Sequence, residues 1–169
     1  AIGEPPTTRG YTPSVFSMLP KLLERSGQSE KGSITGFYTV LVEADDMNDP
    51  IADTCRSILD GHIVLSRDLA DSGHYPPIDV LKSVSRLMND VSSQQHIRAA
   101  MELRDVMAAY KGAEDLINIG AYQDGSNPRI DRAKKMMPEI RTFLRQQVGQ
   151  RHEFAQSVAL LEEIVTRQE

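Results

Sequence analysis

The hydrophobic pattern of this chain changes once, in the stretch from His74 to Met88, and that change constrains the fold more than any other feature. Before this stretch, β-branched and aromatic runs alternate with helical patterns. From Ser92 onward, apolar residues recur at about the 3.6-residue period of an α-helix, and no strand pattern returns. The sequence therefore predicts an α/β part over residues 1–90 and an all-helical part over residues 91–169.

The α/β part carries a strand, a helix and a second strand in succession. Residues 34–42 are β-branched and aromatic without clean alternation, which is typical of a strand covered on both faces. Asp49 or Pro50 begins a helix that carries Cys55, and residues 62–66 form the next strand. A helix long enough to cross over predicts a right-handed parallel βαβ unit. Residues 66–71 follow as one short helix.

An earlier helix is expected after a loop of residues 1–12. Thr12 can cap it, with Pro13 at the first position, where a missing N–H costs nothing. Pro20 removes a backbone hydrogen bond within the pattern, so we expect a kink or a break there. Gly27 is expected to end the helix.

The segment 27–33 resembles a phosphate-binding loop only superficially. It has two glycines at the required separation, followed by a hydroxyl group. However, Lys31 precedes Gly32 instead of following it, and the loop runs from a helix to a strand. The signature needs the lysine after the glycine and a helix after the loop, so this segment does not qualify.

The helical part predicts a small bundle, because each of its segments has one apolar face. Asn127 and Pro128 begin one of these helices, and Pro138 predicts a kink within it. Gly120 ends the helix before it. The four expected helices are centred on residues 97–110, 116–119, 130–144 and 154–165.

The composition excludes several classes of protein. A hydrophobic content of 40% and a charged content of 25% are ordinary for a globular domain. The net charge of -5 argues against a nucleic-acid surface, which needs clustered Lys and Arg. There is no secretory signal and no apolar run of membrane-spanning length. Cys55 is the single cysteine, which suits the cytosol and predicts a small buried side chain.

Neither the clustered acids nor the four histidines have the spacing of a metal site or a catalytic site. Asp45, Asp46 and Asp49 lack the alternate ligand spacing, central glycine and closing glutamate of a calcium loop, so we expect a solvated acidic loop and no metal. No serine lies in a strained strand-to-helix turn with an orienting partner. The histidines are therefore expected to be structural or solvated.

The stretch from His74 to Met88 also carries the groups of a nucleotide site. Tyr75 offers a ring that can stack on a base, and Arg86 offers a planar guanidinium that matches phosphate oxygens. From the residue types alone, a surface loop with a buried tyrosine and a solvated arginine remains the alternative.

Five motifs in this chain resemble, in order and spacing, the rotary-type ATPases. The resemblance is closest to the flagellar and type III protein export ATPases, relatives of the ATP synthase catalytic subunit. It covers nearly the whole chain and implies the end of a P-loop, RecA-like nucleotide-binding domain followed by a helical C-terminal domain. The motifs are Gly3–Phe16, Lys31–Thr35, Ala44–Asp53, Ile58–Arg67 and His74–Met88.

The resemblance implies roles for individual residues. Tyr75 matches the aromatic residue that packs against adenine, and Arg86 in Ser83-Val84-Ser85-Arg86 matches the arginine finger that reaches a neighbouring subunit's site. A second adenine-side aromatic is expected near Val148, and its absence puts a tight aromatic sandwich in doubt. Two loops are implied to face a central coiled-coil stalk, with contact residues Asp45, Asp46, Asp49, Gln123, Asp124, Gly125 and Ser126.

The resemblance also implies the activity and its surroundings. The parent enzyme would hydrolyse ATP with Mg²⁺ in a homohexameric ring, energising bacterial flagellum assembly or type III secretion. Its partners would be the stalk, a regulator and export chaperones, with no nucleic acid and with the membrane reached only through the export gate. Its location would be cytoplasmic, peripheral to the export apparatus at the inner membrane.

The sequence is expected to be a C-terminal piece of such an enzyme, since it begins within a motif and without an initiator methionine. The phosphate-loop lysine, the magnesium-binding hydroxyl and acid, and the water-activating glutamate are not among these residues, so the piece alone is expected not to hydrolyse ATP. Two alternatives stay open. One is a non-catalytic helical module that binds chaperones or the stalk; the other is a non-catalytic ring subunit of a proton-pumping ATPase, although the run from Gly3 to Phe16 favours the export family.

Overall fold

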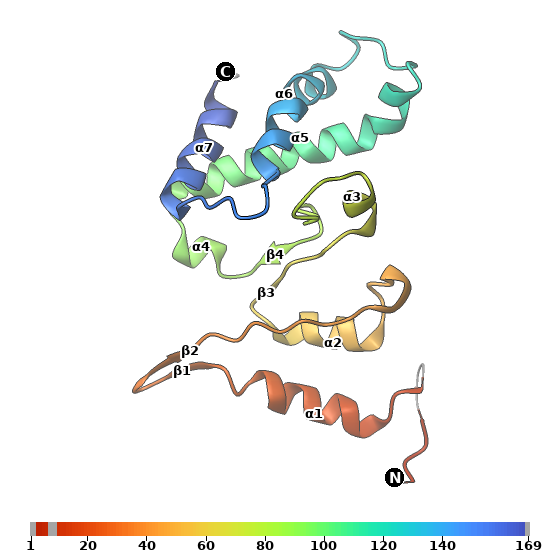
Figure 1. Cartoon of the computed structure of the whole chain (residues 1–169), viewed down its shortest axis with the longest axis vertical. Helices are drawn as coiled ribbons and strands as arrows, with labels where there is room; N and C mark the ends of the chain where they lie inside the picture. The colour runs from red at the N-terminus through yellow and green to blue at the C-terminus, as the bar shows by residue number, and fades with distance from the viewer. Residues whose placement is uncertain (1–2, 7–9, 168–169) are drawn as a thin grey trace. The chain divides into compact units, whose positions relative to one another are not determined.

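The computed structural model describes residues 3–6 and 10–167 of the chain. The chain divides into two compact units, Ala1–His62 and Ile63–Glu169, which are described separately (Figure 1). The expected loop of residues 1–12 lies partly outside the described residues. The division by compactness falls within the predicted α/β part, and the domain boundary near residue 90 stays a prediction.

Helix α1, Pro13–Leu23, opens the first unit and differs from the expectation at both ends. The Thr12 side chain does not cap it; instead the Ser14 N–H donates to Glu4 Oε1 at 3.2 Å. The helix runs through Pro20 without a break, because a proline removes a single bond and the following turn is closed by Glu24 N–H on the Pro20 carbonyl at 2.9 Å. It ends four residues before Gly27, where a strand begins.

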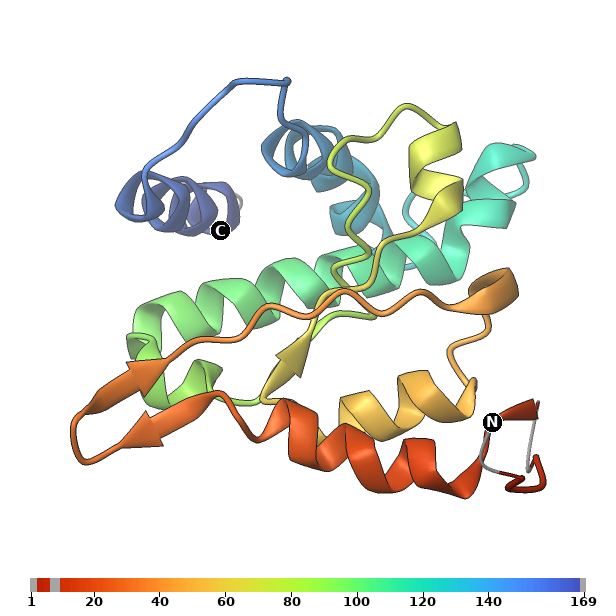
Figure 2. The ribbon, with the colours of Figure 1, turned by 60° about the horizontal axis from the view of Figure 1, so that its bottom comes forward.

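Strands β1, Gly27–Ser29, and β2, Gly32–Ile34, form an antiparallel hairpin (Figure 2). In this hairpin Gln28 lies opposite Ser33. Gly27 and Gly32 have φ angles of 140° and 150°, which other residues rarely adopt. Residues 27–33 therefore form most of a hairpin that follows a helix, and not a phosphate-binding loop.

Helix α2, Pro50–Ile58, begins where the sequence predicts. Asp49 is its N-cap, and the Asp49 Oδ1 atom accepts from the N–H groups of Ile51 at 2.9 Å and Ala52 at 3.3 Å. Helices α1 and α2 pack together, and the buried apolar residues of this unit are Leu23, Ala52 and Cys55. The buried thiol confirms the prediction for Cys55, and burial raises its pKa.

The parallel βαβ unit predicted for this region is not formed among the described residues. Strand β2 ends at Ile34 and β3 comprises only Gly61–His62, so residues 35–42 belong to no strand. The side chains of Phe37 and Leu41 are each 92% exposed. A strand covered on both faces needs neighbouring strands and covering helices, and the described residues supply neither for this segment.

The second unit is built on three helices: α5, Gln94–Asn118; α6, Pro128–Leu144; and α7, Phe154–Thr166 (Figure 1). Helix α5 packs against both others, and α6 also packs against α7. Met136 and Ile140 of α6 are completely buried at the centre of the apolar core. The core residues that surround them are Ala99, Leu103, Val106, Ala109, Ala133, Met137, Leu161 and Ile164.

Two of the four helices predicted for this region form a single continuous helix. Helix α5 is continuous over 25 residues, where the sequence predicted separate helices around residues 97–110 and 116–119. A glycine inside a helix costs only about 0.5–1 kcal/mol, and burial of the adjacent Ala113 holds the helix together across Gly112. Helix α6 begins as predicted, with the Asn127 side chain accepting from Arg129 N–H at 3.0 Å, and it continues through Pro138.

Short elements precede this bundle. Helix α3, Arg67–Asp71, follows Ser66, whose hydroxyl accepts from Leu69 N–H at 3.4 Å, and confirms the expected short helix. Strand β4, Val84–Ser85, and helix α4, Met88–Val91, lead into α5. Within the described residues, no helix combines the length and apolar character needed to cross a membrane.

Candidate functional site

Tyr75 lies in the loop after α3, with its backbone held from two sides. The His74 N–H donates to the Leu69 carbonyl at 2.8 Å, and the Tyr75 carbonyl accepts from Gln146 N–H at 2.8 Å. The Tyr75 side chain is 55% exposed. The loop therefore presents an accessible ring on an anchored backbone. The alternative expectation of a surface loop with a buried tyrosine does not describe this arrangement.

His74, next to that ring, is buried. Burial and the positive charges of Arg145 and Arg141 lower the pKa of the imidazole, so His74 is held in its neutral form. His96 packs edge-on against Phe154, and His152 shares a hydrogen bond of 2.8 Å with Gln150. These placements agree with structural or solvated roles.

The segment after α6 lies beside Tyr75 through the Gln146 bond. It forms a turn in which Gln147 N–H donates to Gln150 Oε1 at 2.9 Å and Gln150 N–H donates to the Gln147 carbonyl at 3.0 Å. Val148, within this turn, is fully exposed. The position where the resemblance implies a second aromatic is therefore close in the fold, but it offers an aliphatic side chain.

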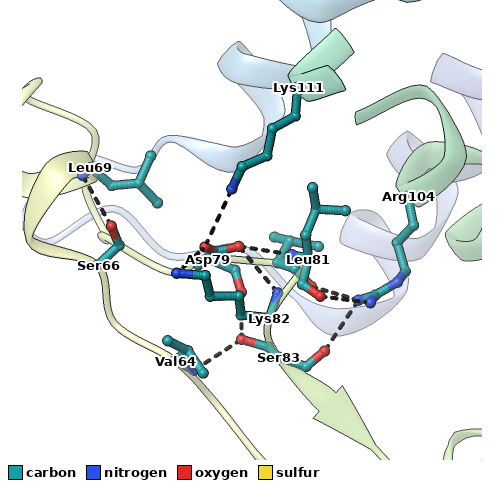
Figure 3. Close-up of polar contacts among 10 residues, drawn as sticks. Val64, Ser66, Leu69, Asp79, Leu81, Lys82, Ser83, Arg104 and Lys111 are labelled. Atoms are coloured by element: carbon teal, nitrogen blue, oxygen red, sulfur yellow. Dashed lines mark hydrogen bonds and ion pairs between the residues drawn. The ribbon is translucent and has the colours of Figure 1, made fainter. Parts of the chain in front are cut away.

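Arg86 follows β4 directly and is exposed. The turn before it is organised by Asp79 (Figure 3). The Asp79 Oδ1 atom accepts from the N–H groups of Leu81 and Lys82, both at 3.1 Å, and the Asp79 N–H donates to the Val64 carbonyl at 2.8 Å. The Ser83 hydroxyl donates to the Asp79 carbonyl at 2.7 Å and accepts from Val64 N–H at 3.0 Å. The five residues 79–83 thus form a closed turn, called the Asp79 turn below.

Helix α5 holds the Asp79 turn through two basic side chains, as Figure 3 shows. The Arg104 guanidinium donates to the carbonyls of Val80 at 2.5 Å, Leu81 at 3.1 Å and Ser83 at 3.2 Å. Lys111, two helical turns further along α5, places its ammonium 3.9 Å from Asp79 Oδ2. Neither Asp79 nor Arg104 was anticipated from the sequence. The available signal was an arginine next to the buried Leu103 on a helix, where a partly buried guanidinium needs hydrogen-bond partners.

The three acids of the acidic loop are not equivalent. The short 3-10 helix η2, Glu43–Asp45, has φ angles of 52° at Ala44 and 57° at Asp45, and Asp45 is exposed. The Asp46 Oδ1 atom accepts from Asn48 N–H at 2.9 Å. Asp49 is only 4% exposed because its carboxylate caps α2. Asp45 and Asp46 are thus more accessible to a partner than Asp49.

The turn between α5 and α6 is exposed and well ordered by its own bonds. Gly125, at a φ of 87°, donates its N–H to Asp131 Oδ2 at 3.0 Å, and the Ser126 hydroxyl donates to the Gln123 carbonyl at 2.6 Å. The Lys134 ammonium lies 2.7 Å from Asp124 Oδ1, and this bond raises the lysine pKa. Gln123, Asp124, Gly125 and Ser126 therefore form a defined surface feature.

In the parts of the chain that the structure describes, no three His, Cys, Asp or Glu side chains gather closely enough to hold a metal ion.

Two family models match this chain. Residues 1–85 match the ATP synthase alpha/beta family nucleotide-binding domain, and residues 92–163 match the T3SS EscN ATPase C-terminal domain. The flagellum-specific ATP synthase of Bacillus subtilis (strain 168) is 53% identical over 169 residues, which are 100% of this chain and 39% of that protein.

Solved structures agree with this match. The assembled ATPase EscN of the enteropathogenic E. coli type III secretion system is 48% identical and superimposes with a TM-score of 0.92, covering 96% of this chain and 40% of that chain. EscN in complex with its central stalk EscO is 46% identical, with a TM-score of 0.84, covering 96% of this chain and 38% of that chain.

This chain spans about two fifths of the length of these relatives. The matched families also confirm the predicted fold class, the end of a nucleotide-binding domain followed by a helical C-terminal domain. The chain belongs to the ATP synthase alpha/beta family and corresponds to a C-terminal portion of its flagellar and type III secretion ATPases.

Proposed function

We propose that the full-length protein hydrolyses ATP in a ring of identical subunits and so energises flagellar or type III protein export. This proposal rests mainly on the 48% identity and TM-score of 0.92 to the assembled EscN ATPase over 96% of the chain. The chain contributes an adenine-side ring, Tyr75, and a trans-acting arginine, Arg86. We further propose that the nucleotide-binding part ends near residue 90 and that the helical domain occupies residues 91–169.

Tyr75 would pack against the adenine base. Its exposed ring suits a stacking surface, because the Tyr75 carbonyl and the N–H of the preceding His74 anchor the backbone around it. Base stacking on an aromatic side chain contributes about 1–3 kcal/mol in other systems. Val148, in the turn bonded to Tyr75 through Gln146, would add an apolar contact at the edge of the base. The adenine would thus meet one ring and one aliphatic group.

Arg86 would act on the site of the neighbouring subunit. As the phosphoryl group transfers, negative charge spreads over its oxygens, and a guanidinium placed there stabilises that charge. Such an arginine finger raises turnover by about a thousandfold or more. Bound Mg²⁺ would neutralise charge on the phosphate oxygens, with ligands from parts of the parent beyond these 169 residues. Arg86 suits its role because it is exposed and lies three residues after the organised Asp79 turn.

The acidic loop and the turn of residues 123–126 would contact a basic coiled-coil stalk. EscN has been solved with the central stalk EscO, and both loops are accessible in this chain. Asp45 and Asp46 would supply most of the loop's charge, while Asp49 would shape the loop through its cap. A regulator and export chaperones would be further partners, and the enzyme would work in the cytoplasm, peripheral to the export apparatus.

The test uses the full-length protein and the substitutions Arg86→Ala and Arg86→Lys. Both should lower kcat by about a thousandfold, roughly 4 kcal/mol, with little change in ATP affinity, because the contact is made in the transition state. The lysine variant should do little better, since an ammonium lacks the bidentate fork. Turnover at the wild-type level in Arg86→Ala would reject the role of Arg86.

Mixed rings test whether Arg86 acts in trans. A subunit with a disabled phosphate loop but an intact Arg86 should restore activity to an Arg86→Ala neighbour whose phosphate loop is intact. No recovery in mixed rings of confirmed composition would contradict the proposal. The 169-residue chain alone should release no phosphate from ATP, and a phosphate release that disappears on mutating one of its own residues would contradict that expectation.

A further inference from the structure

Arg86 lies three residues beyond the Asp79 turn, and polar contacts tie that turn to helix α5 and to Val64 (Figure 3). Because only Val84 and Ser85 separate the turn from Arg86, a shift of the turn is transmitted along these two residues toward Arg86. Whatever fixes residues 79–83 therefore helps to set the position of the proposed arginine finger.

Arg104 is the strongest of these constraints. Its guanidinium spans the carbonyls of Val80, Leu81 and Ser83, which lie on successive parts of one turn and belong to no strand or helix. The planar fork of an arginine can bridge several acceptors from one rigid group, and a bond to a charged donor is stronger than a neutral one. Arg104 thus fixes the shape of the turn as well as its location.

The base of Arg104 is itself rigid. The neighbouring residues Leu103 and Val106 are buried in the core formed by α5, α6 and α7. Lys111 on the same helix approaches the Asp79 carboxylate, which holds the amide ends of the turn while Arg104 holds its carbonyl ends. The helical core therefore supports the Asp79 turn, and the Asp79 turn in turn supports the segment that carries Arg86.

We propose that Arg104 is a positioning residue for Arg86: through three carbonyl contacts it fixes the Asp79 turn on α5 and thereby sets where the finger enters the neighbouring subunit's site. This inference rests on the proposed function of Arg86. Displacing a catalytic group by about 1 Å can cost about a hundredfold in rate, which sets the expected scale of the effect.

The first experiment measures kcat and KM of the full-length ring carrying Arg104→Ala. We expect a fall in kcat of about a hundredfold with KM changed by less than about threefold, since the displaced group acts in the transition state. Arg104→Lys keeps the charge and the stem but cannot bridge three carbonyls, so it should lose most of the same activity. Arg98→Ala is the matched control: Arg98 is an exposed arginine six residues earlier on α5 and should leave kcat unchanged.

The second experiment separates positioning from ordinary support of the fold. An Arg104→Ala or Arg104→Lys subunit with an intact phosphate loop is mixed with a subunit whose phosphate-loop lysine is replaced but whose Arg104 and Arg86 are intact. If Arg104 acts through Arg86, the second subunit supplies a correctly placed finger and activity recovers above the sum of the two pure rings. A residue that only supports its own subunit would give no recovery.

Arg86→Ala is run in parallel so that the two proposals fail separately. Recovery with Arg86→Ala but not with either Arg104 variant overturns the positioning role and leaves the proposed function standing. No recovery with any of the three overturns the proposed function itself. Loss of ring assembly in both Arg104 variants, with Arg98→Ala rings intact, also overturns the positioning role, because Arg104 would then be needed for the fold as a whole.

Discussion

The two compact units of this chain differ in how they bury apolar side chains. The unit of residues 63–169 closes around Met136 and Ile140, with buried side chains from α5, α6 and α7 on all sides. Among the described residues of the unit 1–62, the buried apolar side chains are Leu23, Ala52 and Cys55 of α1 and α2, while Phe37 and Leu41 are almost fully exposed.

The difference follows from what each kind of element needs. A helix satisfies its backbone hydrogen bonds internally and must only cover one apolar stripe. A strand needs a neighbour on each side for its backbone and a layer on each face for its side chains. Three helices can therefore complete a core within this length, whereas the segment 35–42 has the sequence of a covered strand without the elements that cover it.

The largest effect is expected in the closed core. Met136→Ala removes a completely buried side chain and should lower the free energy of unfolding by about 2–5 kcal/mol, because a cavity remains between the three helices. Chemical denaturation of the 169-residue chain, followed by circular dichroism, measures it. Met101→Ala on the exposed face of α5 is the matched control and should change stability by less than about 0.5 kcal/mol. Equal effects of the two would mean that the core does not lie where Met136 is.

The same contrast explains which parts of the fold can be predicted from sequence. Helix starts are local: the predicted starts at Asn127-Pro128, at Asp49-Pro50 and near Ser66 are confirmed, although the predicted Thr12 cap is not formed. Residues 34–42 have the composition of a strand, but a strand forms only by pairing with other segments, so residues 35–42 form no strand and the predicted parallel unit is not formed here.

The candidate site divides in a similar way. Tyr75 and Arg86 are identified from a motif, and their roles stay predictions. The Arg104 contacts join residues 21 to 24 positions apart, and no local pattern specifies such a pairing. The general rule that a partly buried polar group needs a hydrogen-bond partner applies to Arg104, but it does not say which residues are the partners, so the sequence did not predict this role.

A smaller effect is expected at the cap of α2 in the first unit. Asp49→Ala removes the acceptor for two N–H groups and should cost about 0.5–2 kcal/mol locally. Asp49→Asn keeps an acceptor without the charge and should cost less. Hydrogen exchange of individual amides should show faster exchange in α2 and unchanged exchange in α5.

The control for that experiment is Asp53→Ala, which breaks an exposed ion pair with Arg56 and should cost less than about 1 kcal/mol. If Asp49→Ala accelerated exchange in α5 as strongly as in α2, the two units would not respond independently. A separate measurement, stalk binding by the Asp49→Asn variant, shows whether the charge of Asp49 contributes to the partner surface beyond its capping role.

A pH-dependent effect is expected in the second unit at His74. Burial and the charges of Arg145 and Arg141 lower the pKa of His74 below its ordinary value of 6.5. Below that pH the unfolded chain binds a proton that the folded chain resists, so stability falls as the pH drops, until the folded state is also protonated. Well above pH 6.5 the histidine is neutral in both states and contributes no slope.

His74→Gln should remove this contribution. The difference in unfolding free energy between the wild type and the variant should be constant above pH 7 and should shrink as the pH falls below 6.5. Denaturation midpoints at several pH values between 7.5 and 5 measure this difference, which cancels the slopes from carboxylates common to both proteins. A difference that is flat across that range would show that His74 titrates equally in both states.

The smallest change in the free energy of unfolding is expected at Leu41, and this substitution tests the difference between the two units most directly. Leu41→Ala removes an apolar side chain that is 92% exposed, so the free energy of unfolding of the 169-residue chain should change by less than about 0.5 kcal/mol. In the full-length protein, where the rest of the nucleotide-binding domain can cover this segment, the same substitution should cost about 2–5 kcal/mol. Phe37→Ala should behave in the same way. If Leu41→Ala destabilises the short chain as much as Met136→Ala does, the segment already packs into a core and the contrast between the units is wrong. If Leu41→Ala changes the free energy of unfolding of neither protein, residues 34–42 are not buried in the full-length protein, and their strand-like composition does not reflect a covered strand.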